Sequence, residues 1–272
     1  MGTESTYVLT NDEVMTLLNT PAQKQPDLSI VIPAFHEEKR IGQTLEELEV
    51  FLDHDEFFMV KDVEVVVVVA DSPDKTNEIV TAKQGLFQHF VFLKPGPEVG
   101  KGRDVQYGML RASGKLAVFM DADLATPLHH VQQFYEACAE GNDVVIGTRN
   151  LLTYRSNVFR GLFASFGNLL YRIAGGMWIE DTQCGFKMFT ERARKLCFSK
   201  LTILGWGFDI ELLAIAQANG LKIKTFRIDD YKNMPFSTHT EGVLTIAVRT
   251  VRDFGQITLN RLRGAYVNNR QG

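Results

Sequence analysis

The sequence predicts one α/β domain built on a doubly wound, mostly parallel sheet with helices on both faces. Three observations support this fold class. Apolar runs of strand length alternate with stretches of helical periodicity, and the connections between them are short. The run VEVVVVVA at 63–70 is almost entirely β-branched, which is typical of a central parallel strand that helices cover on both sides.

The strands and helices are expected to alternate along the chain. Each predicted strand is a short apolar run, of which LSIVIPA at 28–34 is the first. The other strands are expected at 63–70, 89–95, 115–121 and 143–149. Helices are expected where apolar residues recur three or four positions apart, as Ile41, Leu45 and Leu48 do. These are 39–52, 101–112 and 128–140, after a short polar helix at 12–19.

The α/β domain is expected to span residues 27–240. An N-terminal extension at 1–26 precedes it, and a C-terminal amphipathic helix and tail at 241–272 follow it. The C-terminal segment has arginines on one side and apolar residues at helical spacing on another, namely Leu244, Ala247, Val248, Val251 and Phe254. Two interpretations fit this pattern: a helix lying on an anionic membrane surface, or a helix packed on the domain with its arginines in water.

Composition and charge exclude several classes of protein. A net charge of −4 argues against a nucleic-acid-binding protein, which would carry a strong basic excess. Residues 242–272 nevertheless hold five arginines and one aspartate, a local charge of +4. No signal peptide or run of 18 apolar residues is visible, so a cytoplasmic protein without a transmembrane segment is expected. Cys138, Cys184 and Cys197 lack the spacing of a metal site and are expected to be buried, reduced thiols.

Two aspartates follow the predicted strand at 115–121, in the stretch VFMDADLATP. Alternate side chains of an extended segment point the same way, which brings Asp121 and Asp123 within about 7 Å of each other. A hard divalent cation with oxygen ligands would relieve the repulsion between these two charges. The alternative is a pair of solvated carboxylates in a loop.

Polar residues also end the other predicted strands, in PAFHEE, ADSPD and GTR. Since the carboxyl ends of parallel strands meet at one edge of a sheet, a binding site is expected at this rim. Gly100, Lys101 and Gly102 open the helix that follows the third strand, which presents free backbone N–H groups and an ammonium to an anion. A plain surface turn is the alternative.

The motifs VIPAFHEEKRI, ADSPDKT, GKGRDVQYGMLRASG, FMDADLAT, VVIGTR, DTQCGFKMF and GWGFDIELL occur in this order. Together they resemble the inverting family 2 glycosyltransferases of GT-A fold, the fold of nucleotide-diphospho-sugar transferases. Within that family they are most similar to the dolichyl- or polyprenyl-phosphate hexose synthases. The resemblance covers about residues 28–265, and its most specific parts are DTQCGFK and the combination of GKG with DADLAT.

On the donor side, the resemblance implies UDP-glucose or GDP-mannose as substrate, with Mg²⁺ or Mn²⁺ held by Asp121 and Asp123. Such a cation neutralises the diphosphate that leaves. The nucleotide-binding residues that the resemblance implies are Pro33, Ala34, Glu37, Asp71, Lys101 and Asp121. Asp71 departs from the family pattern, which has two adjacent aspartates at the end of the second strand, and base recognition by an acid there is open.

On the acceptor side, the resemblance implies a polyprenyl or dolichyl phosphate bound by arginines, whose planar fork contacts two phosphate oxygens. Arg149 matches the first arginine; Arg160, with Ser165 behind it, matches the second, and Arg155 competes for that role. Asp181 takes the place of an acceptor-side carboxylate that orients the acceptor, binds sugar hydroxyls or acts as a base. The stretch WGFDIE is expected to wall the sugar pocket, although its Phe208 and Ile210 also suit a core. His129 and His130 are interpreted as surface residues.

Other functions stay open at this point. The same arginines suit a small soluble acid such as a glycerate, which would make membrane contact unnecessary. A catalytically inactive nucleotide-sugar-binding protein is a further alternative, for two reasons. The family's two adjacent aspartates are missing, and DYKNMPFSTHTEG has no lysine or arginine after its serine, where the family carries one in the stretch that follows its last strand. A sugar nucleotidyltransferase is disfavoured, since PAFHEE is not a glycine-rich phosphate loop. If the acceptor is a lipid, peripheral contact with the cytoplasmic face of a membrane is expected.

Overall fold

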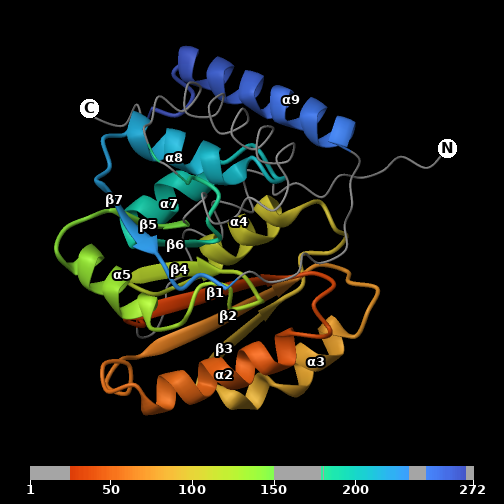
Figure 1. Cartoon of the computed structure of the whole chain (residues 1–272), viewed down its shortest axis with the longest axis vertical. Coiled ribbons are helices and arrows are strands. Elements are labelled where there is room, and N and C mark those ends of the chain that lie inside the picture. The colour runs from red at the N-terminus through yellow and green to blue at the C-terminus, as the bar shows by residue number, and fades with distance from the viewer. Residues whose placement is uncertain (1–24, 150–178, 180, 233–242, 268–272) are drawn as a thin grey trace.

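The computed structural model describes residues 25–149, 179, 181–232 and 243–267. In this part of the chain seven strands form one twisted sheet between two layers of helices, in the order β3-β2-β1-β4-β6-β5-β7 (Figure 1). The predicted doubly wound α/β fold is therefore confirmed. The helix expected at 12–19 and the extension at 1–24 lie outside the described residues.

All the expected strands are present within two residues of their predicted bounds. The strands are β1 (Leu28–Ala34), β2 (Val63–Val69), β3 (His89–Leu93), β4 (Leu116–Met120), β5 (Val144–Arg149), β6 (Phe186–Thr190) and β7 (Ile223–Ile228). β6 alone runs antiparallel to its neighbours β4 and β5, with Phe186 opposite Met120. The segment that precedes β6 therefore lies at the same rim as the carboxyl ends of the parallel strands.

The helices divide between the two faces of the sheet. They are α2 (Ile41–His54), α3 (Thr76–Ala82), α4 (Lys101–Arg111), α5 (His130–Ala139), α7 (Glu191–Ser199), α8 (Phe208–Ala218) and α9 (Val243–Leu262), with a short 3₁₀ turn η1 (Gln84–Leu86). α2, α3 and α5 lie on one face, and α4, α7 and α8 lie on the other (Figure 1). α9 crosses over α8 as an outer layer (Figure 1).

The core consists of two apolar layers, one on each side of the sheet. Val31, Val66 and Val68 face α4 and α8, whereas Ile30, Val65 and Val67 face α2 and α5. Burial on both faces is why both strands read as almost continuous apolar runs, interrupted by Ser29 in β1 and Glu64 in β2. All three cysteines are buried and free, as expected. Burial raises the pKa of the Cys138 thiol to about 12 and that of Cys184 to about 11, which keeps both thiols protonated.

α9 has two apolar sides with different surroundings. Ile257 is fully buried, and the carboxyl of Asp253 packs so closely on Gly207 that a Cβ there would lie 2.4 Å from Oδ2. The opposite side exposes four aliphatic side chains, Val248 (63 %), Val251 (61 %), Leu259 (44 %) and Leu262 (80 %). We call this set the outer apolar stripe. Among the described residues, none of the helices is long and apolar enough to cross a bilayer.

Candidate active site

The site lies at the rim where β1, β2, β4 and β5 end. Residues 181–185, which lead into β6, lie at the same rim. Asp121 and Asp123 follow β4 directly, and both are partly exposed at this rim. The turn that holds them is fixed from both sides: Thr44 Oγ1 of α2 donates to the Ala122 carbonyl at 2.6 Å, and the Ala125 N–H donates to Asp123 Oδ1 at 3.0 Å. The carboxylates therefore keep their positions although they repel each other.

The close approach of Asp121 to β6 explains the glycine in DTQCGFK. Because β6 is antiparallel, Gly185 lies beside the end of β4. A Cβ at Gly185 would lie 2.2 Å from Asp121 Oδ2, well inside van der Waals contact. Only glycine leaves room for the carboxylate there. This motif thus shapes the acidic end of the site as well as supplying Asp181.

Lys101 brings a cation to the same point. Its ammonium forms an ion pair with Asp121 and stands 5.6 Å from the centroid of the exposed Trp206 ring. Burial opposes the charge of Lys101, but the charges of Asp121 and Asp209 outweigh it, so the pKa of Lys101 is raised and the ammonium stays protonated. Lys101 can therefore meet the phosphates of a nucleotide at the start of α4.

The two glycines of Gly-Lys-Gly set the position of that ammonium. A Cβ at Gly100 would lie 2.7 Å from the Leu204 carbonyl oxygen, and one at Gly102 would lie 2.7 Å from Phe208 Cβ. The Arg103 N–H also donates to the Leu204 carbonyl at 3.2 Å. Glycine at both positions lets α4 begin directly against the loop that carries Trp206.

A buried ion pair supports this cluster from beneath. Lys187 of β6 is fully buried; its ammonium pairs with Asp209 of α8 and donates to the Cys184 carbonyl at 2.6 Å. Asp209 in turn adds to the field that raises the pKa of Lys101. Lysines and aspartates thus alternate from Lys187 through Asp209 and Lys101 to Asp121. We treat Lys187 and Asp209 as groups that position Lys101 and Asp121.

Asp121 and Asp123 fit a hard divalent cation. They offer carboxylate oxygens, the ligands that Mg²⁺ and Mn²⁺ prefer, from neighbouring positions of one turn. Burial, and next the charge of Asp121, raise the pKa of Asp123. A bound cation would stabilise both carboxylates in their charged form.

The loops after β1 and β2 are tied into one unit. The His36 N–H donates to Ser72 Oγ at 3.0 Å, and the Glu37 N–H donates to Thr76 Oγ1 at 2.9 Å. Both hydroxyls donate to Asp74 Oδ1 at 2.6 Å. Burial opposes the charge of Asp74, but the hydrogen bonds from Ser72 and Thr76 lower its pKa to about 2. Asp74 thus anchors both loops, a role that its position in the turn ADSPD does not reveal in the sequence.

The expected nucleotide-binding residues take different positions in this unit. Pro33 and Ala34 are buried in the last residues of β1, and Asp71 is exposed just beyond β2. Glu37 is partly buried and pairs with Arg40 at 3.2 Å. Burial raises the pKa of Glu37 despite that partner, and Asp123 and Asp121 lie near enough to add to the rise. The structure thus brings Glu37 beside the paired aspartates.

The acceptor-side residues form a second charged group. Arg149, the last residue of β5, binds the carboxylate of Asp181 through two hydrogen bonds. Its Nε donates to Oδ2 at 2.6 Å, and its Nη2 donates to Oδ1 at 3.1 Å. The backbone N–H groups of Arg149 and Gln183 also donate to this carboxylate. Burial opposes the charge of Asp181, yet the bonds from Arg149 lower its pKa. The Tyr231 ring lies 5.5 Å from the guanidinium carbon of Arg149.

Several expected site residues are not placed. Arg155, Arg160 and Ser165 lie outside the described residues. Phe208 and Ile210 are fully buried, so these two belong to the core; Trp206 is the exposed member of the stretch WGFDIE. The sequence did not predict the pairing of Lys187 with Asp209. A lysine within a strand and an acid at the start of an apolar helix are both unusual, and together they could have indicated a buried pair.

This fold and rim define an α/β transferase whose acidic turn suits a diphosphate-bearing donor and whose arginine suits an anionic acceptor. Residues 29–191 match the family model described as glycosyl transferase family 2, and the chain belongs to this family. It is therefore a glycosyltransferase. The resemblance drawn from the sequence motifs is confirmed.

Curated relatives and solved structures agree with this assignment. The chain is 30 % identical to dolichyl-phosphate beta-glucosyltransferase ALG5D of Trichomonas vaginalis, over 83 % of this chain and 72 % of the relative. It is 30 % identical to the human dolichyl-phosphate beta-glucosyltransferase, over 76 % of this chain and 71 % of the relative. The mannosyltransferase PcManGT of Pyrobaculum calidifontis, solved with GDP-Man and Mn²⁺, shares the fold at a TM-score of 0.58 and 17 % identity, over 93 % of this chain and 70 % of that one.

Proposed function

We propose that this protein transfers a hexose, glucose or mannose, from UDP-glucose or GDP-mannose to a polyprenyl or dolichyl phosphate with inversion at the anomeric carbon. The observation that carries the proposal is the pairing of two charged groups at one rim: Asp121, Asp123 and Lys101 for the donor, and Arg149 with Asp181 for the acceptor. The activity named for the relatives favours glucose and a dolichyl phosphate.

On the donor side, Asp121 and Asp123 would hold Mg²⁺ or Mn²⁺, whose charge stabilises the departing diphosphate. Lys101 reaches the same phosphates with its ammonium, and Glu37 and Asp71 flank the ribose and base. Pro33 and Ala34 act through the backbone, since their side chains are buried. In the ion pair with Lys101, Asp121 keeps a neutralising partner before the donor binds.

On the acceptor side, a phosphate monoester is already an anion and needs no strong base. One of its oxygens attacks the anomeric carbon, the bond from that carbon to the diphosphate breaks, and the nucleoside diphosphate leaves with the electron pair. Asp181 holds Arg149 and is poorly suited to accept a proton, because Arg149 stabilises its charged form. We assign Asp181 the role of positioning Arg149 for the acceptor phosphate, with Arg155, Arg160 and Ser165 as further acceptor contacts.

The protein would meet its lipid through α9, on the cytoplasmic face of a membrane. At about 100° per residue, the outer apolar stripe falls within about 80° of arc and lies roughly opposite the buried Ile257. Arg252 adjoins the stripe, and the local charge of residues 242–272 is +4. An apolar stripe flanked by arginines matches a surface of anionic lipids.

α9 also links such a membrane to the donor site. Asp253 packs on Gly207, and Arg249 Cδ would lie 3.9 Å from a Cβ at Gly205. Trp206 lies between these two glycines and stands over Lys101. Docking of α9 on lipid therefore keeps the rim close to the headgroup layer.

The proposal is tested by measuring nucleoside diphosphate release from UDP-glucose and from GDP-mannose, each with and without dolichyl phosphate. Release that requires the lipid phosphate and stops on chelation of divalent cations is expected. Release onto a soluble acid such as glycerate, without lipid, would favour the soluble-acceptor alternative. Nucleotide-sugar binding with no release under any condition would identify an inactive binding protein.

A further inference from the structure

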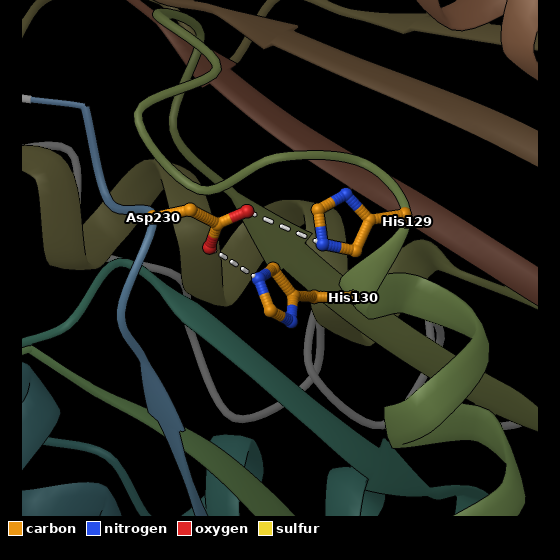
Figure 2. Close-up of side chains that lie close together, drawn as sticks. All are labelled: His129, His130 and Asp230. Carbon is orange, nitrogen blue, oxygen red and sulfur yellow. Dashed lines mark hydrogen bonds and ion pairs between the residues drawn. The ribbon is translucent and has the colours of Figure 1, made fainter.

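A second polar cluster lies near the rim and takes no part in the proposed transfer. Figure 2 shows the side chains of His129 and His130, at the start of α5, converging on the carboxylate of Asp230, just beyond β7. His129 Nε2 lies 3.3 Å from one carboxylate oxygen, and His130 Nε2 lies 2.7 Å from the other. The three potential ligand atoms all lie within 4.8 Å of one another.

We propose that His129, His130 and Asp230 bind a transition-metal cation of the Zn²⁺ class, at a site distinct from the paired aspartates. Tetrahedral Zn²⁺ with nitrogen and oxygen ligands requires donor atoms about 3.3 Å apart, which small side-chain rotations supply here. The ligand atoms of the two sites favour different metals. Imidazole nitrogens favour zinc and its neighbours in the first transition row, whereas the all-oxygen pair Asp121 and Asp123 suits Mg²⁺ or Mn²⁺.

The surroundings of His130 are compatible with the tautomer that a metal ligand needs. Its Nδ1 lies 3.5 Å from Gln133 Oε1, while its Nε2 faces Asp230, so both ring nitrogens face oxygen atoms. A neutral imidazole carries one N–H and cannot donate to both. When a cation lies between Nε2 and Asp230, the N–H can sit on Nδ1 and donate to Gln133. Nε2 then offers its lone pair to the metal, which is the usual arrangement of a metal-bound histidine.

Such a site would have a structural consequence for the acceptor side. Asp230 is followed by Tyr231, whose ring lies against Arg149, and by Lys232, whose N–H donates to the Ala125 carbonyl at 2.8 Å. A cation bound by Asp230, His129 and His130 would link residues 230–232 to the start of α5. Such a cation would therefore help to hold Tyr231 against Arg149.

Zinc binding to the untagged full-length protein tests the proposal, by equilibrium dialysis in excess Mg²⁺ that occupies the paired aspartates. One Zn²⁺ per chain is expected for the wild type, and Co²⁺ should give the visible absorption of a tetrahedral site. His130→Ala and Asp230→Asn are each expected to weaken binding by more than about tenfold. Added Zn²⁺ should raise the thermal unfolding midpoint of the wild type and leave that of Asp230→Asn unchanged.

His89→Ala is the matched control, because His89 also pairs with one carboxylate, that of Asp62 at 3.1 Å. Within the described part of the chain, this pair belongs to no cluster of three potential metal ligands. The His89→Ala variant should bind Zn²⁺ as the wild type does. Equal binding by the wild type and Asp230→Asn, equal loss in the His89 variant, or no Zn²⁺ retained in micromolar dialysis would each overturn the proposal. Asp230→Asn keeps the size of the side chain, so it remains informative if His130→Ala folds poorly.

Discussion

At the scale of single residues, Gly185 is the most sharply constrained position of the donor site. In Gly185→Ala the new methyl would stand 2.2 Å from Asp121 Oδ2 and push the carboxylate out of place. We expect transfer activity to fall more than about tenfold and unfolding free energy to fall by about 1–3 kcal/mol. Steady-state kinetics and urea unfolding measure the two effects.

Gly85→Ala is the control for this substitution, since a Cβ at Gly85 would meet nothing within 4 Å. It should leave activity unchanged and stability within about 0.5 kcal/mol of the wild type. If Gly185→Ala kept full activity, the tight contact with Asp121 would have no functional meaning.

Lys101 offers a second residue-scale test, because it is the cation that already pairs with Asp121. Lys101→Met keeps much of the side-chain volume and removes the ammonium that we propose meets the diphosphate. We expect the kcat/KM for the nucleotide sugar to fall by about a hundredfold, as for other lost contacts to a developing negative charge. Lys115→Met is the comparison, because Lys115 is exposed and pairs with Asp27 at 2.8 Å, before the start of β1. Equal kinetics for the two variants would remove Lys101 from the donor site.

At the scale of elements, Asp74 connects the loop after β1 to the loop after β2. Its pKa of about 2 lies below the ordinary value of 3.8, so its charged form stabilises the folded state. That contribution is complete above about pH 4 and is lost as the pH falls toward 2. Asp74→Asn should therefore lower the unfolding free energy by about 1 kcal/mol at neutral pH, after allowance for solvent screening.

The sign of the pH effect gives this prediction its test. The stability difference between the wild type and Asp74→Asn should shrink between about pH 4 and pH 3 in urea unfolding experiments. Asp71→Asn, in the same loop but exposed, is the control and should leave the unfolding free energy within about 0.5 kcal/mol of the wild type. A difference that stayed constant with pH would mean that the charge of Asp74 contributes nothing.

The strand–helix order was predictable from the sequence because β1 to β5 are short apolar runs between polar turns. The antiparallel β6 was not, since its residues FKMFT include a lysine that reads as exposed and proves fully buried. The partners of this lysine explain that burial: the charge of Asp209, 22 residues further along the chain, and the Cys184 carbonyl. Pairing between distant residues leaves little trace in local periodicity, and this is also why Asp74 and Asp230 escaped attention.

The candidate site was predictable to a similar extent. Asp121, Asp123, Lys101 and Arg149 follow strand ends or open a helix, so the geometry of a parallel sheet brings them together. The ion pairs from Lys101 to Asp121 and from Arg149 to Asp181 depend on the reversed direction of β6 and on the position of α4. Those features are tertiary, and the sequence carried them only through the motif resemblance.

At the scale of the whole molecule, the charge is divided between a domain of net negative charge and a C-terminal segment of +4. Such a molecule should approach an anionic surface with α9 first, because the rest of the chain is repelled. Vesicles containing anionic lipid are therefore expected to carry the protein in flotation experiments at low ionic strength. Added salt should weaken this association, since attraction across water falls off within a Debye length.

The outer apolar stripe should provide the part of this binding that resists salt. Val248→Glu combined with Val251→Glu places two charges in the stripe, so we expect flotation to be lost while transfer to a short-chain, water-soluble polyprenyl phosphate is kept. Val60→Glu is the control: Val60 is 78 % exposed and lies in the loop between α2 and β2. α2 lies on the face of the sheet opposite α9 (Figure 1). Flotation that survived the double substitution, or that the Val60 variant lost equally, would rule out α9 as the membrane contact. Loss of flotation with activity on the short acceptor intact would instead separate lipid docking from the chemistry at the rim.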